Sequence, residues 1–267
     1  AGPGGTLDGR TARAFRTRGT LRSMVMATFW WGVLLSGRIL PVVVLVPAFG
    51  GKRLPLQVKL GLAATISMAV LALVEPRGSP PGGLLFLGLL LKEMAVGSVL
   101  ALAGACLFDA MRIGGQMIDL FRGSSAASAL VPQSGERVSP LGDLHLLLAV
   151  AVFFSASGPE LFARALLSSF ERLPLGSFPA ASTATEAGEL AIALTAQALR
   201  MGLSIALPAA VSILAVDCLL GFINRTAPQI QVFFLGMPLR VVVGIAIVAL
   251  TLEGSMGRFL ALLTSCR

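Results

Sequence analysis

Long apolar runs, separated by short clusters of Gly, Pro, Ser and charged residues, dominate this chain of 267 residues. The runs are rich in Leu, Ala and Val and show no alternation of period two, so they predict helices and no strands. The chain is therefore expected to be all-α. Its breaks predict six to eight helical segments, over Met24–Val46, Gln57–Val74, Leu84–Leu120, Leu141–Ser157, Pro159–Leu173, Glu186–Asn224, Gln229–Leu252 and Gly254–Ser265.

Three loops interrupt the helical pattern. The clearest covers residues 75–83, which contain three prolines and three glycines and therefore cannot continue a helix. Residues 122–139 form a second loop, and a Ser/Thr/Ala linker covers residues 177–185. Residues 1–23 are rich in Gly and Thr and poor in apolar side chains, so we expect a disordered basic extension before a single helical domain over residues 24–267.

Composition places the chain among integral membrane proteins, or among subunits that are buried on nearly every side. Hydrophobic residues make up 55% of the chain and charged residues 13%, against about 25% charged residues in soluble domains. The longest charge-free runs, 144–159 and 201–216, would span only about 24 Å as helices, whereas a bilayer core is about 30 Å thick. Several helices also carry charges inside them: Arg38, Lys59, Lys92, Glu93, Arg200, Asp217 and Arg240.

Charges inside apolar helices usually face protein, water or an opposite charge. The long side chains of Lys59 and Arg240 can instead extend to the headgroup region. Asp217 is short and has apolar neighbours on both sides, so we expect a cation to compensate it. The candidate cations are Arg200, Arg225 or a residue of another subunit.

The stretch from residue 217 to 240 predicts a broken helical hairpin. One break falls at Ala227-Pro228-Gln229 and a second at Gly236-Met237-Pro238, since proline removes a backbone donor and disfavours the helical region for the preceding residue. In apolar surroundings, each break leaves main-chain groups that only protein or a wet cavity can satisfy. The hairpin is therefore expected to pack inside an assembly rather than against lipid.

The loop 122–139 contains mainly Gly, Ser, Ala and Pro in its first half. Small side chains bury little area, which predicts a weakly anchored and mobile segment. Small side chains can also mark a close approach of membrane helices. The residues alone favour neither interpretation.

The net charge of +8 is concentrated near the start of the chain, in Arg10, Arg13, Arg16, Arg18 and Arg22. A basic bias beside the first apolar segment favours a cytoplasmic N-terminus. Because no soluble binding domain follows, no nucleic-acid partner is expected.

Catalytic signatures are missing from the sequence. His145 is the single histidine, and no nucleotide-binding, G-x-S-x-G or metal-ligand spacing occurs. The three cysteines lie far apart and suit core packing. We expect a protein that is not an enzyme and that holds no cofactor or metal.

The C-terminal pattern N-R-x-A-P-Q, followed by V-F-x-x-x-M-P, resembles the type III secretion export-gate family, which includes FliR and SctT. Further stretches resemble the family in the same order: Val46-Pro47, residues 54–63, Gly115–Asp119 with Arg122-Gly123, residues 132–142 and the turn Leu173–Gly176. The resemblance runs from Phe29 to Phe259. Its C-terminal motif consists of Asn224, Arg225, Ala227, Pro228, Gln229, Val232, Phe233, Met237, Pro238 and Arg240.

The resemblance implies a fold of helical hairpins in a hetero-oligomeric gate, through which unfolded proteins leave the bacterial cytoplasm. Such a gate lies at the inner membrane, partly raised into the periplasm. The implied partners are SctR/FliP-like and SctS/FliQ-like membrane proteins, an SctU/FlhB-like switch protein, the exported proteins and membrane lipid.

The resemblance also implies that the loop 122–139 plugs the conduit. Val131 stands where the family commonly has an acid, so any role of that acid does not transfer. The plug residues would be Arg122, Gly123, Ser124, Ser125, Pro132, Gln133, Gly135, Glu136 and Arg137, and the assembly hairpin would use Asp217, Asn224, Arg225, Pro228, Gln229, Met237, Pro238 and Arg240. Arg122 and the pair Glu136-Arg137 would anchor the two ends of the loop.

Three features look more like SctT of virulence injectisomes than like FliR of flagella: Ser139–Gly142, Asp217 and Met237-Pro238. A flagellar relative with the same role is the first alternative. A secondary transporter for a small solute is the second, because broken helices beside intramembrane charges are typical of such proteins. A transporter would predict an inverted repeat, and the sequence shows no internal repeat.

Overall fold

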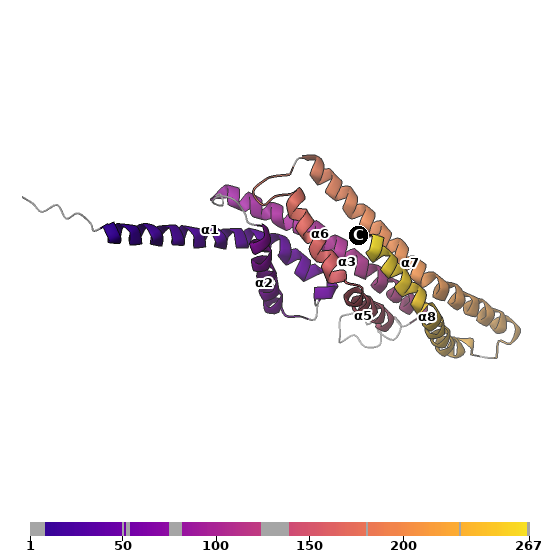
Figure 1. Ribbon diagram of the computed structural model, residues 1–267. Helices are drawn as coiled ribbons and strands as arrows, with labels where there is room; N and C mark the ends of the chain where they lie inside the picture. The colour runs from indigo at the N-terminus through magenta and orange to yellow at the C-terminus, as the bar shows by residue number, and fades with distance from the viewer. Residues whose placement is uncertain are drawn as a thin grey trace, which may run out of the picture.

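The computed structural model describes residues 9–49, 51, 54–74, 82–123, 139–179, 181–229 and 231–265. All regular secondary structure in these ranges is helical, which confirms the all-α prediction (Figure 1). The helices are α1 (Gly9–Leu45), the short 3₁₀ helix η1 (Pro47–Phe49), α2 (Leu56–Val74), α3 (Leu84–Phe121), α5 (Pro140–Ser155), α6 (Gly158–Arg172), α7 (Ala181–Thr226) and α8 (Val232–Ser265).

The long helix α3 forms the centre of an elongated bundle. It makes its most extensive contacts with α7, α1 and α5, while α8 packs against α7 as the second arm of a hairpin. The start of α1 and the turn between α7 and α8 project from opposite ends of the bundle (Figure 1). The central helix thus contacts elements from both halves of the chain.

Glycines allow α3 to approach its neighbours closely. A Cβ atom at Gly97 would collide with the carbonyl group of Arg38 on α1, and one at Gly115 would collide with the backbone of Leu141 on α5. A Cβ at Gly114 would lie 2.8 Å from the side chain of Ile205 on α7. Such contacts between backbones are typical of helices packed in membranes.

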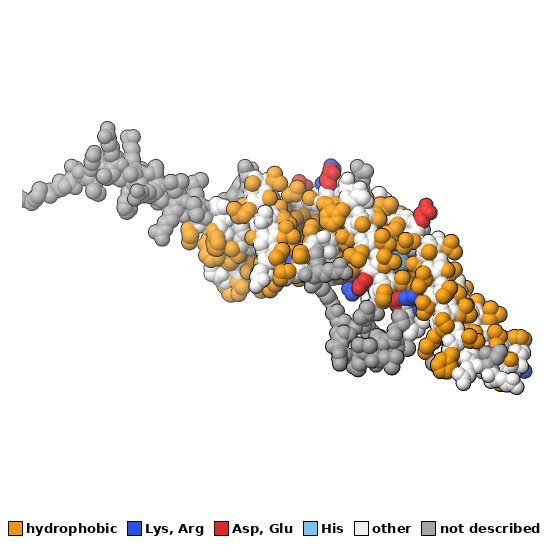
Figure 2. Space-filling model, turned by 90° about the horizontal axis from the view of Figure 1, so that it is seen from below, with side chains coloured by type: hydrophobic (Ala, Val, Ile, Leu, Met, Phe, Trp, Pro, Cys, Tyr) orange, Lys and Arg blue, Asp and Glu red, His pale blue; other side chains and the backbone are white. Residues whose placement is uncertain are grey.

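The apolar helices match the predicted membrane class. In the described residues, five helices are long and apolar enough to cross a membrane, and α5 and α6 together form a further apolar pair bent by 77°. Little of this apolar surface is covered within the chain, since only 17% of the most apolar part of α8 is buried. Hydrophobic side chains accordingly spread over the visible face of the molecule (Figure 2).

Several predicted boundaries were wrong, and in each case the helix is longer than expected. The helix α8 continues through Pro238 and Gly254, where a second break and a separate final helix were predicted. The helix α7 begins at Ala181, whereas its start was predicted at Glu186, and it contains Pro208 in its interior. A proline removes only one backbone hydrogen bond, and apolar surroundings favour keeping the remaining bonds inside the helix.

The first helix also differs from the prediction. It begins at Gly9, whereas the first helical segment was predicted to begin at Met24. Adding residues to an existing helix is favourable compared with starting a new one, which explains how a polar Arg- and Thr-containing stretch extends α1. Residues 75–81 of the predicted loop 75–83 lie outside the described part of the chain.

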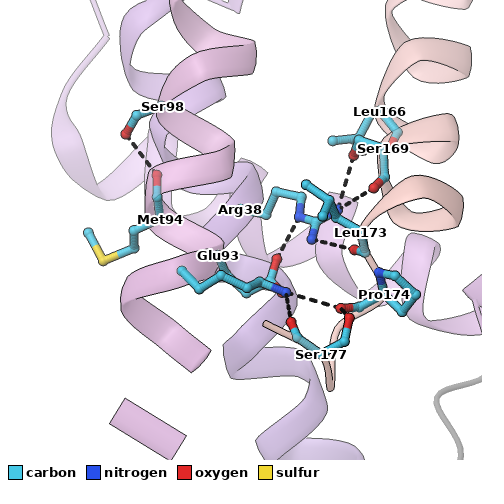
Figure 3. Close-up of polar contacts among 10 residues, drawn as sticks. Arg38, Glu93, Met94, Ser98, Leu166, Ser169, Leu173, Pro174 and Ser177 are labelled. Atoms are coloured by element: carbon cyan, nitrogen blue, oxygen red, sulfur yellow. Dashed lines mark hydrogen bonds and ion pairs between the residues drawn. The ribbon is translucent and has the colours of Figure 1, made fainter. Parts of the chain in front are cut away.

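A buried ion pair joins α1 to α3 (Figure 3). Arg38 Nε donates to Glu93 Oε2 at 2.5 Å, and both side chains have an exposed fraction of 0%. The Arg38 guanidinium also donates to the carbonyl oxygens of Ser169 at 2.9 Å and Leu173 at 2.8 Å, and it lies 4.1 Å above the ring of Phe170. Arg38 therefore holds the end of α6 as well.

Lys92 completes this network. It forms an ion pair with Glu93 and donates to the carbonyl oxygens of Pro174 at 3.0 Å and Ser177 at 3.2 Å. The turn after α6 is thus held by two cations that share one carboxylate. The prediction that these helix-internal charges face protein is confirmed, and Lys59 on α2 is buried as well.

We predict that Gly97→Val separates α1 from α3, because the new side chain would collide with the backbone of Arg38. Inserting methyl groups into such a contact costs about 1–3 kcal/mol. The expected result is a lower thermal unfolding midpoint and less folded protein in the membrane. Gly61→Val on α2 is the matched control, since no atom lies within 4 Å of a Cβ there. Equal midpoints for the two variants would contradict this close contact.

Candidate functional site: the loop base and the hairpin tip

The two described ends of the loop 122–139 meet at Asp119, near the end of α3. Asp119 has an exposed fraction of 2% and forms an ion pair with Arg122. Its Oδ2 atom accepts hydrogen bonds from Ser139 Oγ at 2.6 Å and from the backbone nitrogen of Leu141 at 2.9 Å. One buried carboxylate therefore binds both the first and the last residue of the loop.

Local sequence explains where the flanking helices end and begin. Gly123 follows α3 with a φ of +80°, a conformation that glycine adopts without a steric penalty. Ser139 caps α5, because its hydroxyl oxygen accepts from the backbone nitrogen of Gly142 at 3.2 Å. Pro140 occupies the first position of α5, where its missing donor costs no hydrogen bond.

The helix α8 also contacts the base of the loop, through the side chain of Arg122. A Cβ at Gly244 would collide with the Cγ and Cδ atoms of Arg122, so the aliphatic part of this arginine packs directly on α8. Arg112 of α3 lies 3.7 Å from the carboxylate of Asp143 on α5, which adds a weaker, partly exposed contact. The base of the loop is thus formed by α3, α5 and α8.

The turn between α7 and α8 forms the second part of the site. The backbone nitrogen of Ala227 donates to Ile223 at 2.8 Å as α7 ends, and Pro228 and Gln229 form the turn. The predicted break at Ala227-Pro228-Gln229 is confirmed. The two helices run antiparallel from this turn, as a hairpin requires.

Asp217 and Arg240 bind each other across the hairpin. Arg240 Nε donates to Asp217 Oδ1 at 2.6 Å, and the two side chains have exposed fractions of 36% and 37%. Asp217 does have a cation partner, but the two candidates named within the chain, Arg200 and Arg225, were wrong. They were chosen as neighbours along α7, whereas the turn brings Arg240 of α8 opposite Asp217.

The hairpin tip exposes large apolar side chains. Phe222 and Phe234 on either side of the turn have exposed fractions of 67% and 69%. Hydrophobic side chains are also visible at this end of the molecule in the space-filling view (Figure 2). Large apolar side chains that lie exposed next to one another are typical of a surface that contacts lipid or another protein. The predicted hairpin residues Asn224, Arg225, Pro228, Gln229, Met237 and Pro238 are all exposed.

Two of the predicted plug residues can be placed. Arg122 binds Asp119, and Gly123 ends the last turn of α3. The remaining ones lie outside the described residues: Ser124, Ser125, Pro132, Gln133, Gly135, Glu136 and Arg137.

Sequence reasoning did not identify Asp119, Ser139 and Gly244 as site residues. The spacing of Asp119 and Arg122 by three residues on a helix was an available signal for their pairing, and Ser139-Pro140 was a signal for a helix start. Nothing in the sequence around Gly244 indicates its contact with Arg122, because that contact depends on how α8 crosses the end of α3.

The described residues offer no obvious catalytic or metal chemistry. His145 is buried, and its Nδ1 atom lies 2.8 Å from the carbonyl oxygen of Leu141 in the same helix. In the described ranges, no group of three His, Cys, Asp or Glu side chains could hold a metal ion.

Comparison with known proteins identifies relatives along nearly the whole chain. The family described as bacterial export proteins, family 1, matches residues 27–265. The flagellar biosynthetic protein FliR of Escherichia coli is 31% identical over 225 residues, which cover 83% of this chain and 82% of the relative. FliR of Aquifex aeolicus is 30% identical over 216 residues, covering 80% and 82%.

A relative from another secretion system matches over a shorter stretch. The secretion system apparatus protein SsaT of Salmonella typhimurium is 27% identical over 158 residues, which cover 58% of this chain and 59% of the relative. The longer flagellar alignments leave the predicted assignment to the injectisome branch with only weak support. They nevertheless agree with the family match over residues 27–265, and the chain belongs to the bacterial export proteins, family 1, the family of FliR and SctT.

Proposed function

We propose that this protein is a non-enzymatic core subunit of a type III secretion export apparatus, and that it helps to form and seal the conduit for unfolded proteins. The observation that carries the proposal is the loop base, where one buried carboxylate binds both ends of the loop 122–139. Family membership supports the export role over transport of a small solute. The chain is an integral membrane protein whose described residues include five membrane-type helices, and the bacterial inner membrane is its proposed location.

The exposed apolar surface supports assembly with other subunits. Much of α7 and α8 is uncovered, and the hairpin tip carries exposed aromatic side chains. We propose SctR/FliP-like, SctS/FliQ-like and SctU/FlhB-like membrane proteins as partners, with the assembly partly raised into the periplasm. The basic residues in the first turns of α1, ahead of its apolar part, support a cytoplasmic N-terminus.

The loop base supports a seal at the loop 122–139. Asp119 tethers the two loop ends to the junction of α3, α5 and α8, which fixes where a seal formed by this loop would be attached to the bundle. A gate of this kind is held by a small free energy, since moving from mostly closed to mostly open takes about 5.5 kcal/mol of differential binding.

The injectisome branch remains our proposal for the system to which the subunit belongs, with a flagellar export apparatus as the alternative. The residues Ser139–Gly142, Asp217 and Met237-Pro238 support the injectisome branch. The longer alignments with FliR support the flagellar one.

Pro228→Leu is expected to reduce assembly strongly, because leucine permits α7 to continue past Thr226 and would redirect α8. Co-purification of the partner subunits from membranes measures this effect. Pro208→Leu is the matched control, because α7 already continues through Pro208. Normal assembly and secretion by the Pro228 variant would show that the break does not shape the hairpin.

Asp217→Asn is expected to weaken assembly, because it removes the ion pair that aligns the two arms of the hairpin. The pair is about one-third exposed, so we expect a modest effect of about 1 kcal/mol or less. Yield of the complex in membrane extracts is the measurement. Arg240→Gln should act similarly, and the double variant should lose less than the sum of both. Glu253→Gln, an exposed acid elsewhere on α8, serves as control, and additive losses would argue against the pairing.

Deletion of residues 124–129 should leave the complex assembled but leaky, because it shortens the proposed seal. Ser139→Ala should leak more than the parent but less than the deletion, because it removes the hydrogen bond to Asp119, worth about 1.5–3 kcal/mol, together with the cap of α5. Uptake of small solutes by cells that lack the external secretion needle measures the leak. Ser139→Thr keeps the hydroxyl group and should stay tight. An assembled deletion variant as tight as the parent would assign the seal to another subunit.

A further inference from the structure

Two arginines of the α7–α8 hairpin lie in one shallow groove. Arg200 on α7 and Arg258 on α8 line this groove together with Gln197, Met201 and Ser204. Arg258 Nη1 donates to the carbonyl oxygen of Ser204 at 2.9 Å and to its Oγ atom at 3.1 Å, which fixes the guanidinium across the helix interface. We call this feature the arginine groove.

The arginine groove holds two positive charges that the described part of the chain does not neutralise. Elsewhere inside the apolar helices, Arg38 is paired with Glu93 and Arg240 with Asp217, whereas neither groove arginine forms an ion pair with a described carboxylate. The only acid of α8, Glu253, lies five residues before the groove arginine of that helix, about 140° away around the helix. Charges inside apolar helices usually face an opposite charge, so an anion from outside the described chain fits this position.

An apolar cavity of about 240 Å³ adjoins the arginine groove, and Gln197 and Leu262 line both. The bend between α5 and α6 forms one wall of the cavity. Ser157 at this bend has a left-handed φ of 56°, and Gly158 and Phe162 after it line the cavity. The cavity thus lies among α3, the bent pair α5–α6, α7 and α8.

We propose that the arginine groove and the adjoining cavity bind one anionic phospholipid. Two guanidinium groups suit a phosphate, because each presents planar donors that match its oxygens. The apolar cavity suits part of an acyl chain and offers water few hydrogen-bond partners. A free phosphate ion would use only the groove, and an acidic side chain of another subunit would leave the cavity unfilled, so a ligand with both parts fits the observations best.

Basic pockets between membrane helices recognise anionic headgroups by this same combination of charge and access. The two groove arginines are exposed, so a headgroup can reach them from the surface. The proposed lipid would hold α7 and α8 together at a distance from the hairpin turn. This site goes beyond the export role and does not depend on it.

The test uses the protein purified from membranes with the subunits that assemble with it, after removal of bound lipid. Native mass spectrometry then measures binding of phosphatidylglycerol and of phosphatidylcholine with the same acyl chains. The double variant Arg200→Gln/Arg258→Gln should bind phosphatidylglycerol roughly 30-fold more weakly, the equivalent of about 1 kcal/mol per arginine. Its binding of phosphatidylcholine should not change.

Two further variants separate the headgroup from the acyl chain. Ala103 lines the cavity, so Ala103→Met should reduce binding of both lipids by filling it. Arg172→Gln, which removes an exposed arginine at the end of α6, should leave both unchanged.

Four results would overturn the proposal. The first is equal binding of both lipids by the parent protein. The second is unchanged binding of phosphatidylglycerol by the double variant with its other subunits still in place. Inorganic phosphate at millimolar concentration would displace phosphatidylglycerol completely, which would indicate a site for the ion alone. The double variant would lose another subunit while binding phosphatidylglycerol as before, which would place an acidic side chain of that subunit in the groove.

Discussion

The ion pair between Arg38 and Glu93 is the interaction on which the arrangement of the bundle depends. Both charges are fully buried in helices that are otherwise apolar, and separating such a pair would cost about 3–5 kcal/mol. The pair therefore sets how α1 lies along α3. Because Arg38 also binds Leu173 and Lys92 binds Pro174, the same charges position the turn from which the chain proceeds to α7.

Two further ion pairs also hold parts of the structure together, and they are progressively less buried. The pair Asp119–Arg122 is almost fully buried and joins the loop ends to the bundle, while the pair Asp217–Arg240 is about one-third exposed near the hairpin tip. Burial strengthens a charge pair and raises the cost of breaking it. Of these three pairs, the one between α1 and α3 is the most buried and the one that joins the two arms of the hairpin is the most accessible.

Much of the helix pattern follows from local sequence, and the exceptions have a common cause. The starts of α2, α3 and α5 and the turn at Pro228 agree with the predictions, because proline, glycine and serine act there on their immediate neighbours. The predicted ends at Gly254 and within residues 236–238 were wrong, because in apolar surroundings a helix loses less by keeping a proline or glycine than by exposing its backbone. Loop residues 124–138, which hold most of the proposed plug, lie outside the described part of the chain.

The sequence by itself determined the helical class, the membrane-type composition, the family and the need to neutralise charges such as Asp217, since these depend on residue type and spacing along one segment. Only the tertiary structure decided which charges meet. Arg240 rather than Arg200 or Arg225 faces Asp217, Asp119 binds both ends of a loop, and Gly244 receives the side chain of Arg122. Each of these contacts joins separate helices, and the rotation and crossing of packed helices arise from the fit of many side chains together, which no single segment encodes.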